Sequence, residues 1–485
     1  MGIRKIGRRL AASAAATSLA ATATLGAGAG PAHATALGPW RQVANSGLQN
    51  ISEAGLARTP DGVLHVAWAS QQTPNSEGIF TLPIAANGSV GGTQTVTSGW
   101  ASLEDPALGL TPSGGLQAFF GGIQTTVTGA PNSDMNLETS TDGGNTWSLL
   151  TADVIAGPDD TAYASQTAVS NSLIGQASPF ETWTGTSGVW VNAGIAGTTP
   201  DSNYQAQLGG CCGYYSSLAS DAAGNTELAW YSNATGKLGI WAQGVAAGGS
   251  PIGSPLQMPG TANLGVGELQ KTPLVARPQG GFYVVYPIGY PSFTGVELWK
   301  VGGGAIKVGG AAALNPTTAS AAVDQAGRVW VFWSRMVNDK PMLFATRSNP
   351  SVTRFGAVVA VGAPSKTGST YALDGNAANG ALDVVTTLNQ TGSSQISIWT
   401  RHVYPGLSLG LSPASGRLHH AVSVTASVTD AGVPVKGASV TLGGHTATTN
   451  AGGKATIHLQ VSGTTTARAS RAGYVSASAA LTARR

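Results

Sequence analysis

The chain has 485 residues, of which 10% are charged, and its formal net charge at pH 7 is +3. Four basic and no acidic residues lie in the first 34 positions, so the rest carries 21 basic and 22 acidic groups. This balance excludes a broad basic surface for nucleic acid or anionic lipid. Beyond residue 34 no run approaches the roughly 18 apolar residues that a membrane-spanning helix needs.

Residues 1–34 have the organisation of a secretory signal peptide. A basic start is followed by an alanine-rich apolar run and by Ala32-His33-Ala34, which fits an A-x-A cleavage signal. The pair Arg8-Arg9 also fits a twin-arginine leader, so both export routes stay open. We expect a secreted, extracellular protein whose mature chain begins at residue 35.

A repeat of about fifty residues follows. The stretches GLARTPDGVLHVAW (55–68), SLASDAAGNTELAW (217–230) and SAAVDQAGRVWVFW (320–333) each read as strand, glycine turn and strand. The turn glycines are Gly62, Gly114, Gly224, Gly280, Gly327 and Gly380. The interval between the second and third glycines is twice the usual one, which places a diverged seventh copy near residues 163–190.

Two columns of the repeat are apolar. Six residues after the glycines stand Trp68, Phe120, Trp230, Tyr286, Trp333 and Thr386. Six residues before them stand Leu56, Leu108, Leu218, Leu274, Ala321 and Asp374, and we expect these mostly in the core. A third strand follows in each unit, at 79–82, 135–139, 189–192, 238–242, 296–300, 342–346 and 396–400.

These units predict an all-β chain with a seven-bladed β-propeller over residues 35–405. The last unit lacks a fourth strand of its own, and WRQVANSG (40–47) supplies one from the other end of the propeller. Closure by this strand removes an exposed sheet edge. A six-bladed ring with residues 163–200 as an insertion is the alternative.

The stretch STDGGNTW (140–147) resembles the Asp box, S-x-D-x-G-x-T-W, of the sialidase-type (BNR-repeat) β-propeller superfamily. All five fixed positions match, namely Ser140, Asp142, Gly144, Thr146 and Trp147. The resemblance implies a structural hairpin between the third and fourth strands of a blade, away from the active site. Asp142 would order the turn through backbone hydrogen bonds, and Trp147 would pack between blades.

The only two cysteines, Cys211 and Cys212, are neighbours. Their Cα atoms lie about 3.8 Å apart, below the usual disulfide range, so a bond between them closes a small strained ring and no loop. We expect oxidation after export. In propellers that resemble this one, such a vicinal disulfide forms a rigid floor against a ligand; a rigid loop without a ligand and free redox thiols are the alternatives.

Residues 406–485 form a different unit with one acidic residue, Asp430. Short alternating strands, as in TTNAGGKATIHL (448–459), resemble bacterial immunoglobulin-like and carboxypeptidase-regulatory-like modules. The resemblance implies an Ig-like β-sandwich that acts as a spacer or adhesive domain. We expect it to fold alone and to be dispensable for any sugar binding.

Ligands of propellers bind at the channel mouth, where the first strand of each blade begins. Nine residues before the turn glycines this position is polar in every unit. It holds Glu53, Asp105, Tyr215, Lys271, Thr318 and Tyr371, with Tyr163 as the seventh member and Glu104, Tyr214, Asp159, Asp160 and Glu268 beside them. Carboxylates and tyrosines around a concavity suit a polyhydroxylated ligand, and a water-filled channel is the alternative.

A true sialidase is not expected, although YSSLASDAAG (215–224) resembles the stretch that holds the sialidase nucleophile and would assign that role to Tyr215. Sialidases clamp a carboxylate with three arginines, and no arginine here precedes a first strand. Glu53 stands where the resemblance expects the first of them, and its charge would repel sialic acid.

Three functions remain. The first is glycan binding at the mouth by Glu53, Glu104, Asp105, Tyr163, Tyr214, Tyr215, Lys271 and Tyr371, with an extracellular glycan or cell-wall polysaccharide as partner and a monomeric protein. The second is a glycoside hydrolase whose candidate catalytic groups are Glu53, Asp105 and Tyr215, since two suitably spaced carboxyls suffice. The third is a non-catalytic scaffold or adhesin. No cofactor is expected; calcium at Asp159 and Asp160 is the one metal candidate.

Overall fold

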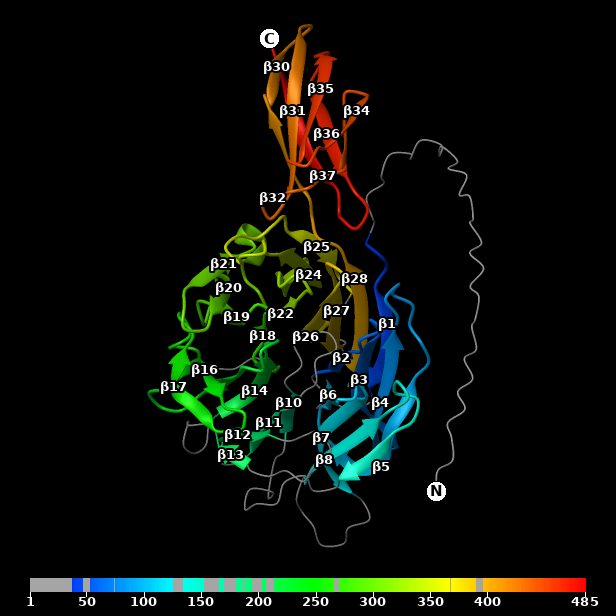
Figure 1. Cartoon of the computed structure of the whole chain (residues 1–485), viewed down its shortest axis with the longest axis vertical. Helices are drawn as coiled ribbons and strands as arrows, with labels where there is room; N and C mark the ends of the chain where they lie inside the picture. Colours follow the sequence, from blue (N-terminus) through cyan, green and yellow to red (C-terminus); the bar gives the residue numbers. More distant parts are fainter. Residues whose placement is uncertain are drawn as a thin grey trace, which may run out of the picture.

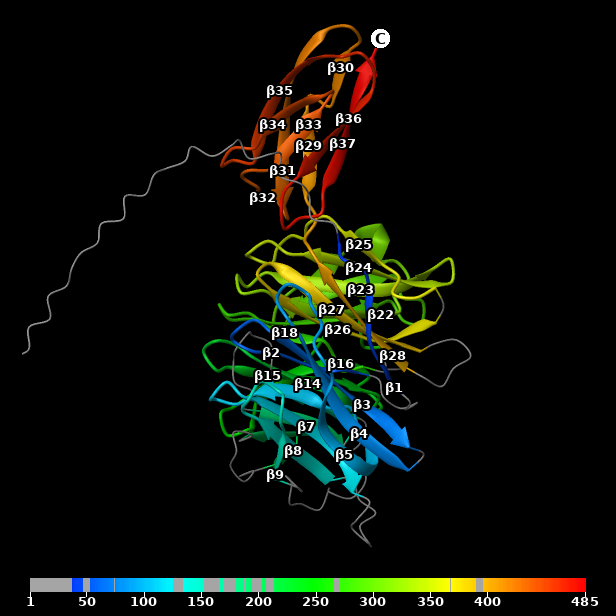
Figure 2. The ribbon, with the colours of Figure 1, turned by 90° about the vertical axis from the view of Figure 1, so that its right-hand side faces the viewer.

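The computed structural model describes residues 37–46, 53–73, 75–124, 134–151, 165–169, 180–185, 188–193, 203–205, 213–265, 270–366, 368–389 and 396–485. Over these residues the chain is all-β, and its N-terminal part is a seven-bladed β-propeller (Figure 1). The C-terminal part is a two-sheet sandwich beyond the rim of the ring, as the two views in Figures 1 and 2 show. None of the described helical segments is long and apolar enough to span a membrane.

The first four blades follow one another along the chain, and pairing of the last strand of blade 1 with the second strand of blade 2 joins these two blades into one eight-stranded sheet. Blade 1 is β2 (Gly55–Arg58), β3 (Leu64–Thr73), β4 (Ser76–Ile84) and β5 (Gln94–Leu103); blade 2 is β6 (Ala107–Leu110), β7 (Leu116–Gln124), β8 (Asp134–Ser140) and β9 (Ser148–Thr151). Blade 3 is β10 (Ser165–Val169), β11 (Phe180–Gly185), β12 (Gly188–Ala193) and β13 (Asn203–Gln205); blade 4 is β14 (Gly213–Ser220), β15 (Thr226–Ser232), β16 (Gly239–Val245) and β17 (Pro251–Gln257). Because β10–β13 form a sheet of their own, the six-bladed alternative is wrong.

The last three blades complete the ring. Blade 5 is β18 (Leu274–Ala276), β19 (Phe282–Ile288), β20 (Gly295–Lys300) and β21 (Ala305–Val308), followed by the short 3-10 helix η1 (Gly310–Ala313). Blade 6 is β22 (Thr318–Val323), β23 (Val329–Val337), β24 (Lys340–Arg347) and β25 (Val359–Gly362). Blade 7 is β26 (Ser369–Ala378), β27 (Ala381–Asn389), β28 (Ile396–Val403) and β1 (Arg41–Ser46).

Strand β1 confirms the predicted closure. It pairs antiparallel with β28 from Arg41 opposite Thr400 to Ser46 opposite Ile396, with one bulge. The fourth strand of blade 7 therefore comes from the opposite end of the propeller sequence, and no outer edge of β28 is left unpaired. A buried arginine joins the same two ends, because Arg58 of blade 1 contacts Asp383 of blade 7 at 2.6 Å.

The glycine turns that reveal the repeat connect the first and second strands of their blades. All six glycines have a positive φ, from 74° at Gly327 to 90° at Gly62. In blade 6, Gly327 N–H donates to the Asp324 carbonyl, and Asp324 Oδ1 accepts the N–H groups of Ala326 and Arg328 at 3.0 Å. Glycine fits because a side chain disfavours this conformation. We call this end of the ring the turn end.

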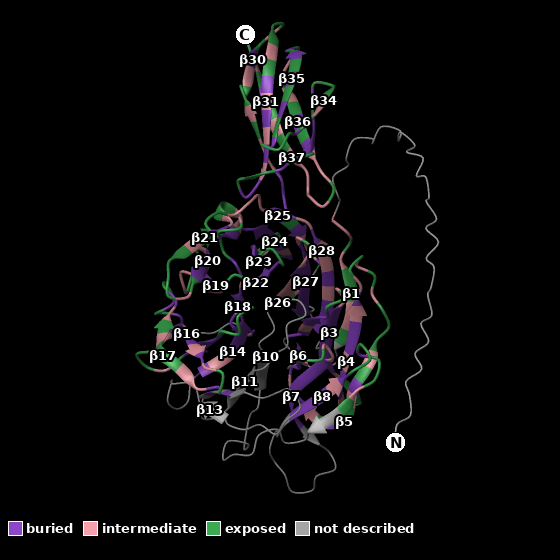
Figure 3. Cartoon of the chain, viewed as in Figure 1, coloured by how far each residue is buried: buried purple, intermediate pink, exposed green. Residues whose placement is uncertain are grey.

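The hydrophobic core lies between neighbouring blades. The aromatic column is buried, from Phe120 and Trp333 at 0% exposed to Trp68 at 4%, and each of these three rings packs where two blades meet. Figure 3 shows the burial concentrated along the inner strands of the blades. Since each blade buries one face against the next, the ring is stable only when closed.

The sandwich consists of two sheets around a separate core. One sheet is β29 (Ser408–Ser412), β31 (Ala421–Asp430), β32 (Val433–Pro434) and β35 (Lys454–Gln460). The other is β30 (Ser415–Arg417), β37 (Ala477–Arg484), β36 (Thr465–Ser470), β33 (Ser439–Leu442) and β34 (His445–Thr448). Alternate residues of β35 are buried, as a strand with one face in a core requires, and they join β31, β33 and β37 in one apolar cluster.

Buried ion pairs fix the sandwich to blade 6. Asp430 Oδ2 accepts Arg328 Nη1 at 2.7 Å and Arg347 Nη2 at 2.5 Å, and Arg347 also contacts Asp324 at 3.2 Å. The Asp430 side chain is 2% exposed. The one acidic residue of the tail therefore neutralises two arginines of the propeller, so the unit over residues 406–485 is packed on the ring rather than tethered beside it.

Candidate functional site

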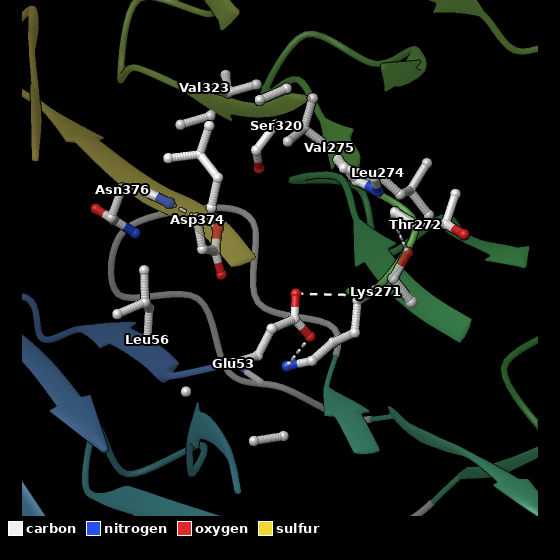
Figure 4. A pocket seen from close by; sticks show the side chains of 18 of the residues that line it. Glu53, Leu56, Lys271, Thr272, Leu274, Val275, Ser320, Val323, Asp374 and Asn376 are labelled. Atoms are coloured by element: carbon white, nitrogen blue, oxygen red, sulfur yellow. Dashed lines mark hydrogen bonds and ion pairs between the residues drawn. The ribbon is translucent and has the colours of Figure 1, made fainter. Parts of the chain in front are cut away.

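A cavity of about 120 Å³ lies inside the ring, between the first strands of the blades (Figure 4). Its described lining comes from blades 1, 2, 4, 5, 6 and 7 and includes Leu56, Leu108, Leu218, Leu274, Ala321 and Asp374. The residues six positions before the turn glycines thus line the channel and, apart from Asp374, also belong to or pack against the buried cores of the blades. The expectation that this column is mostly in the core is confirmed by Leu108, Leu218, Leu274 and Ala321, which are at most 8% exposed.

Glu53 and Lys271 lie together at the end of this cavity opposite the turn end. Glu53 Oε1 accepts the Lys271 backbone N–H at 3.0 Å, and Lys271 Nζ lies 3.6 Å from Glu53 Oε2. The Glu53 backbone N–H donates to Asp105 Oδ2 at 3.1 Å. Three members of the predicted mouth column, from blades 1, 2 and 5, therefore converge.

Burial and charge act against each other in this pair. Burial raises the pKa of Glu53 above its usual value, and the Lys271 charge offsets part of that rise. Burial on its own lowers the pKa of Lys271, but the charges of Glu53, Asp374 and Asp105 outweigh it and raise that pKa. Lys271 is therefore a cation at neutral pH and balances several carboxylates.

Asp374 is the only charged side chain in the leucine column, and it belongs to the same cluster. Its Oδ1 accepts the N–H of its neighbour Gly375 at 2.6 Å. Burial raises its pKa to about 7, with a further rise from the charge of Glu53 that Lys271 only partly offsets. Near neutral pH the Asp374 carboxyl is therefore divided between its acid and its carboxylate forms.

Two tyrosines add hydroxyl groups to this end of the channel. Tyr215 has a φ of 55° in a bulge of β14, where the register with β15 shifts between Tyr214 and Ser217. Burial raises the pKa of Tyr215, as do Tyr371 and the Glu53 charge. Burial and Asp105 likewise raise the pKa of Tyr371. Both hydroxyls stay protonated as hydrogen-bond donors, which disfavours Tyr215 as an ionised nucleophile.

Other predicted residues lie beside the cluster. The Glu104 carboxyl has its pKa raised to about 7 by burial and then by the charges of Asp105 and Glu77. Tyr214 packs against Tyr215 with ring centroids 6.3 Å apart. Thr318 is buried at the start of β22 and does not belong to the cavity lining. Tyr163, Cys211, Cys212, Asp159, Asp160 and Glu268 lie outside the described residues, so their predicted roles stay predictions.

The hairpin over residues 140–147 lies elsewhere, between β8 and β9. Asp142 Oδ1 accepts the backbone N–H groups of Asn145 at 3.1 Å and Thr146 at 2.9 Å, and Ser140 Oγ accepts that of Gly144 at 2.9 Å. The hydroxyl of Thr146 donates to Asp142 and, with these bonds, lowers the Asp142 pKa to about 2. Trp147 packs on a core shared by blades 1 and 2, and no residue of the hairpin lines the cavity.

Sequence reasoning missed two features of the site. Asp374 was counted with the leucines, although its charge in an otherwise apolar column was a visible signal. Gln270 was not considered, yet it is buried and accepts the Leu373 N–H of blade 7. Among the described residues no group of three or more His, Cys, Asp or Glu side chains is arranged to hold a metal ion.

Comparisons with known proteins give distant fold matches. No protein family model matches the chain, and no curated protein matches it. The chain is similar to the Penicillium chrysogenum α-L-arabinanase complexed with arabinobiose, at 13% identity and a TM-score of 0.39 over 76% of this chain and 98% of that one. It is similar to an ancestral GH74 enzyme at 10% identity and a TM-score of 0.43, over 73% of this chain and 51% of that one. It is also similar to puromycin hydrolase at 10% identity and a TM-score of 0.39, over 90% of this chain and 62% of that one. With TM-scores below 0.5, these matches carry no argument about function.

Proposed function

We propose that the protein is exported and binds a glycan at the Glu53–Lys271 end of its channel. The observation that carries this proposal is the convergence of polar side chains from separate blades at one end of one cavity, where Glu53 and Lys271 form the lining and the others lie beside them. Glu53, Asp105, Tyr215, Lys271 and Tyr371 come from blades 1, 2, 4, 5 and 7. A concave site with a few convergent polar groups and shifted pKa values is where a ligand is expected first.

The chemistry of these groups favours a neutral, polyhydroxylated ligand. Carboxylates accept hydrogen bonds from sugar hydroxyls, and protonated tyrosines donate to ring and hydroxyl oxygens while offering an apolar face. Lys271 is the one described cation among Glu53, Asp105 and Asp374, and it is already paired with Glu53. An acidic sugar would meet uncompensated negative charge, which agrees with the absence of an arginine clamp.

A glycan array on residues 35–485 identifies the ligand, and two hydroxyl deletions locate it. Tyr371→Phe and Tyr215→Phe should each weaken binding of an array hit about fivefold to tenfold, the effect of about one hydrogen bond. Tyr474→Phe, in the sandwich, is the matched control and should bind as the unmodified protein does. No hit on the array, or equal binding by all variants, would contradict a glycan site at this end of the channel.

A glycoside hydrolase is the second candidate, and Asp374 is the observation that favours it. The Asp374 carboxyl, with a pKa of about 7, faces the Glu53 carboxyl in the same cavity. Two such carboxyls resemble the general acid and the base of a glycoside hydrolase. The acid form of Asp374 would donate the proton, so turnover should fall as pH rises through about 7. If the protein releases reducing ends from the glycan, and Asp374→Asn abolishes this release while binding persists, the hydrolase candidate is established. Binding without any release of reducing ends would identify a glycan-binding protein without hydrolase activity.

A further inference from the structure

Three consecutive residues, Gln270–Thr272, contact several blades at the end of the channel and are named the strap. They precede β18, the first strand of blade 5, whose neighbours in the ring are blades 4 and 6. Lys271 nevertheless bonds to Glu53 of blade 1, three blades farther round the ring. Such a contact spans the central opening, so the strap lies at the channel within reach of blade 1.

Bonds on both sides anchor the strap. Gln270 Nε2 donates to the Ala319 carbonyl of blade 6 at 2.8 Å, and Gln270 Oε1 accepts the Leu373 N–H of blade 7 at 2.9 Å. The Thr272 N–H donates to the Tyr215 carbonyl of blade 4 at 2.8 Å, and Ser217 Oγ donates to the Thr272 carbonyl. Gln270 and Thr272 are 3% and 2% exposed. The middle residue, Lys271, is thus held in place independently of its own side chain.

The Lys271 ammonium group lies in the cavity beside the Glu53 carboxyl, and the charges of Asp374 and Asp105 also act on it. It lies 3.6 Å from Glu53 Oε2, and the Asp374 carboxyl points toward the same space, as Figure 4 shows. Glu53 and Lys271 together form the end wall of the 120 Å³ cavity, which continues past Asp374 along the first strands. Removal of the lysine side chain beyond Cβ would leave carboxylates facing an enlarged space with no cation.

We propose that Lys271 is the built-in cation of the channel and determines its specificity, because its ammonium group fills a site beside Glu53 that would otherwise bind a primary ammonium group from solution. The strap fixes the lysine backbone, so the ammonium position is set by the fold and not by a ligand. The intact channel therefore excludes amines, whereas a chain without this side chain accepts an alkylammonium ion of the same length. This inference concerns the same end of the channel as the glycan proposal, but its test needs no glycan.

The test is chemical rescue of Lys271→Ala with n-propylammonium, which has the atoms that the substitution removes. The variant should melt below the unmodified protein, because buried carboxylates lose their partner. Added n-propylammonium should raise its melting temperature in proportion to the logarithm of concentration, as a ligand of the folded state does. 1-Propanol, equal in shape and uncharged, should have no such effect, and neither compound should shift the unmodified protein.

Two results would overturn the proposal: a Lys271→Ala protein that melts like the unmodified chain, or one that n-propylammonium and 1-propanol affect equally. If Lys271→Ala does not fold, Lys271→Met tests the same idea by keeping the volume and removing the charge. Glu53→Gln added to Lys271→Met should then restore part of the lost melting temperature, because it removes the unpaired carboxylate. A double variant no more stable than Lys271→Met would contradict the assignment.

Discussion

At the turn end of the ring three of the described arginines form ion pairs with three aspartates, whereas at the strap end one described lysine lies beside the carboxyls of Glu53, Asp105 and Asp374. Arg58 pairs with Asp383, and Arg328 and Arg347 share Asp430, with Asp324 completing the set. At the strap end burial raises the pKa of Asp374 to about 7, with a further rise from the Glu53 charge that Lys271 only partly offsets. Buried aspartates that pair with arginines join blades and domains. Buried carboxyls that outnumber the cations beside them mark where a bound proton or a ligand neutralises the remaining charge.

The largest expected effect is at the turn end. Asp430→Asn should lower the free energy of unfolding by about 3–5 kcal/mol, because Arg328 then has no carboxylate partner and Arg347 keeps only Asp324. Chemical denaturation measures it, and Asp339→Asn, on an exposed turn, is the control. Deletion of residues 406–485 should destabilise the ring in the same way, which limits the expected independence of the tail. A fully stable Asp430→Asn protein would show that the pairing does not hold the two parts together.

Ring closure should be nearly as sensitive. Deletion of residues 37–47 removes β1 and exposes the edge of β28, so aggregation or a large fall in melting temperature is expected. Arg58→Ala tests the second link between blades 1 and 7 and should cost about 3 kcal/mol by leaving Asp383 without that partner. A truncated chain that stays monomeric with unchanged melting would contradict closure by β1.

The blade architecture could be predicted from the sequence, but the partners in the buried ion pairs could not. The glycine turns and the aromatic column recur at the length of one blade, so the period of the repeat was enough to place them. The closing strand was found because the last repeat lacks a fourth strand of its own. The contacts of Lys271 with Glu53 and of Asp430 with Arg328 join residues 218 and 102 positions apart. A repeat says which position faces the axis, but not which side chains meet across it. Asp374 was visible as a charge in a leucine column, and its neighbours were not.

A smaller effect is expected from pH at the strap end. Asp374 has a pKa of about 7 when folded, above its usual 3.8, so unfolding releases its proton between these values and stability falls as pH rises from about 4 to 7. Asp374→Asn abolishes this dependence. The stability of the variant relative to the unmodified protein should therefore increase over that range, by about 4 kcal/mol, and level off above it. Denaturation at several pH values measures the difference, and a constant difference would mean an ordinary carboxyl.

The smallest effect on stability is expected at Cys211 and Cys212. The pair should be oxidised in the exported protein, with a mass lower by about two hydrogens, since export exposes it to an oxidising environment. Replacing both with serine should change the melting temperature little, because no long loop is closed. Affinity for an array glycan should fall, since the cysteines directly precede the strand that carries Tyr214 and Tyr215. Much lower melting with normal binding would make the pair structural.

Hydrogen–deuterium exchange with and without the best array glycan tests the central claim, that the unmatched end of the channel is the binding site. Slower exchange is expected in the segments that begin the first strands, at 53–58, 213–218, 270–276 and 369–375, with no change in the turns at the other end or in residues 406–485. Protection confined to the sandwich, or to the outer strands of the blades, would contradict the account and move the site away from the channel.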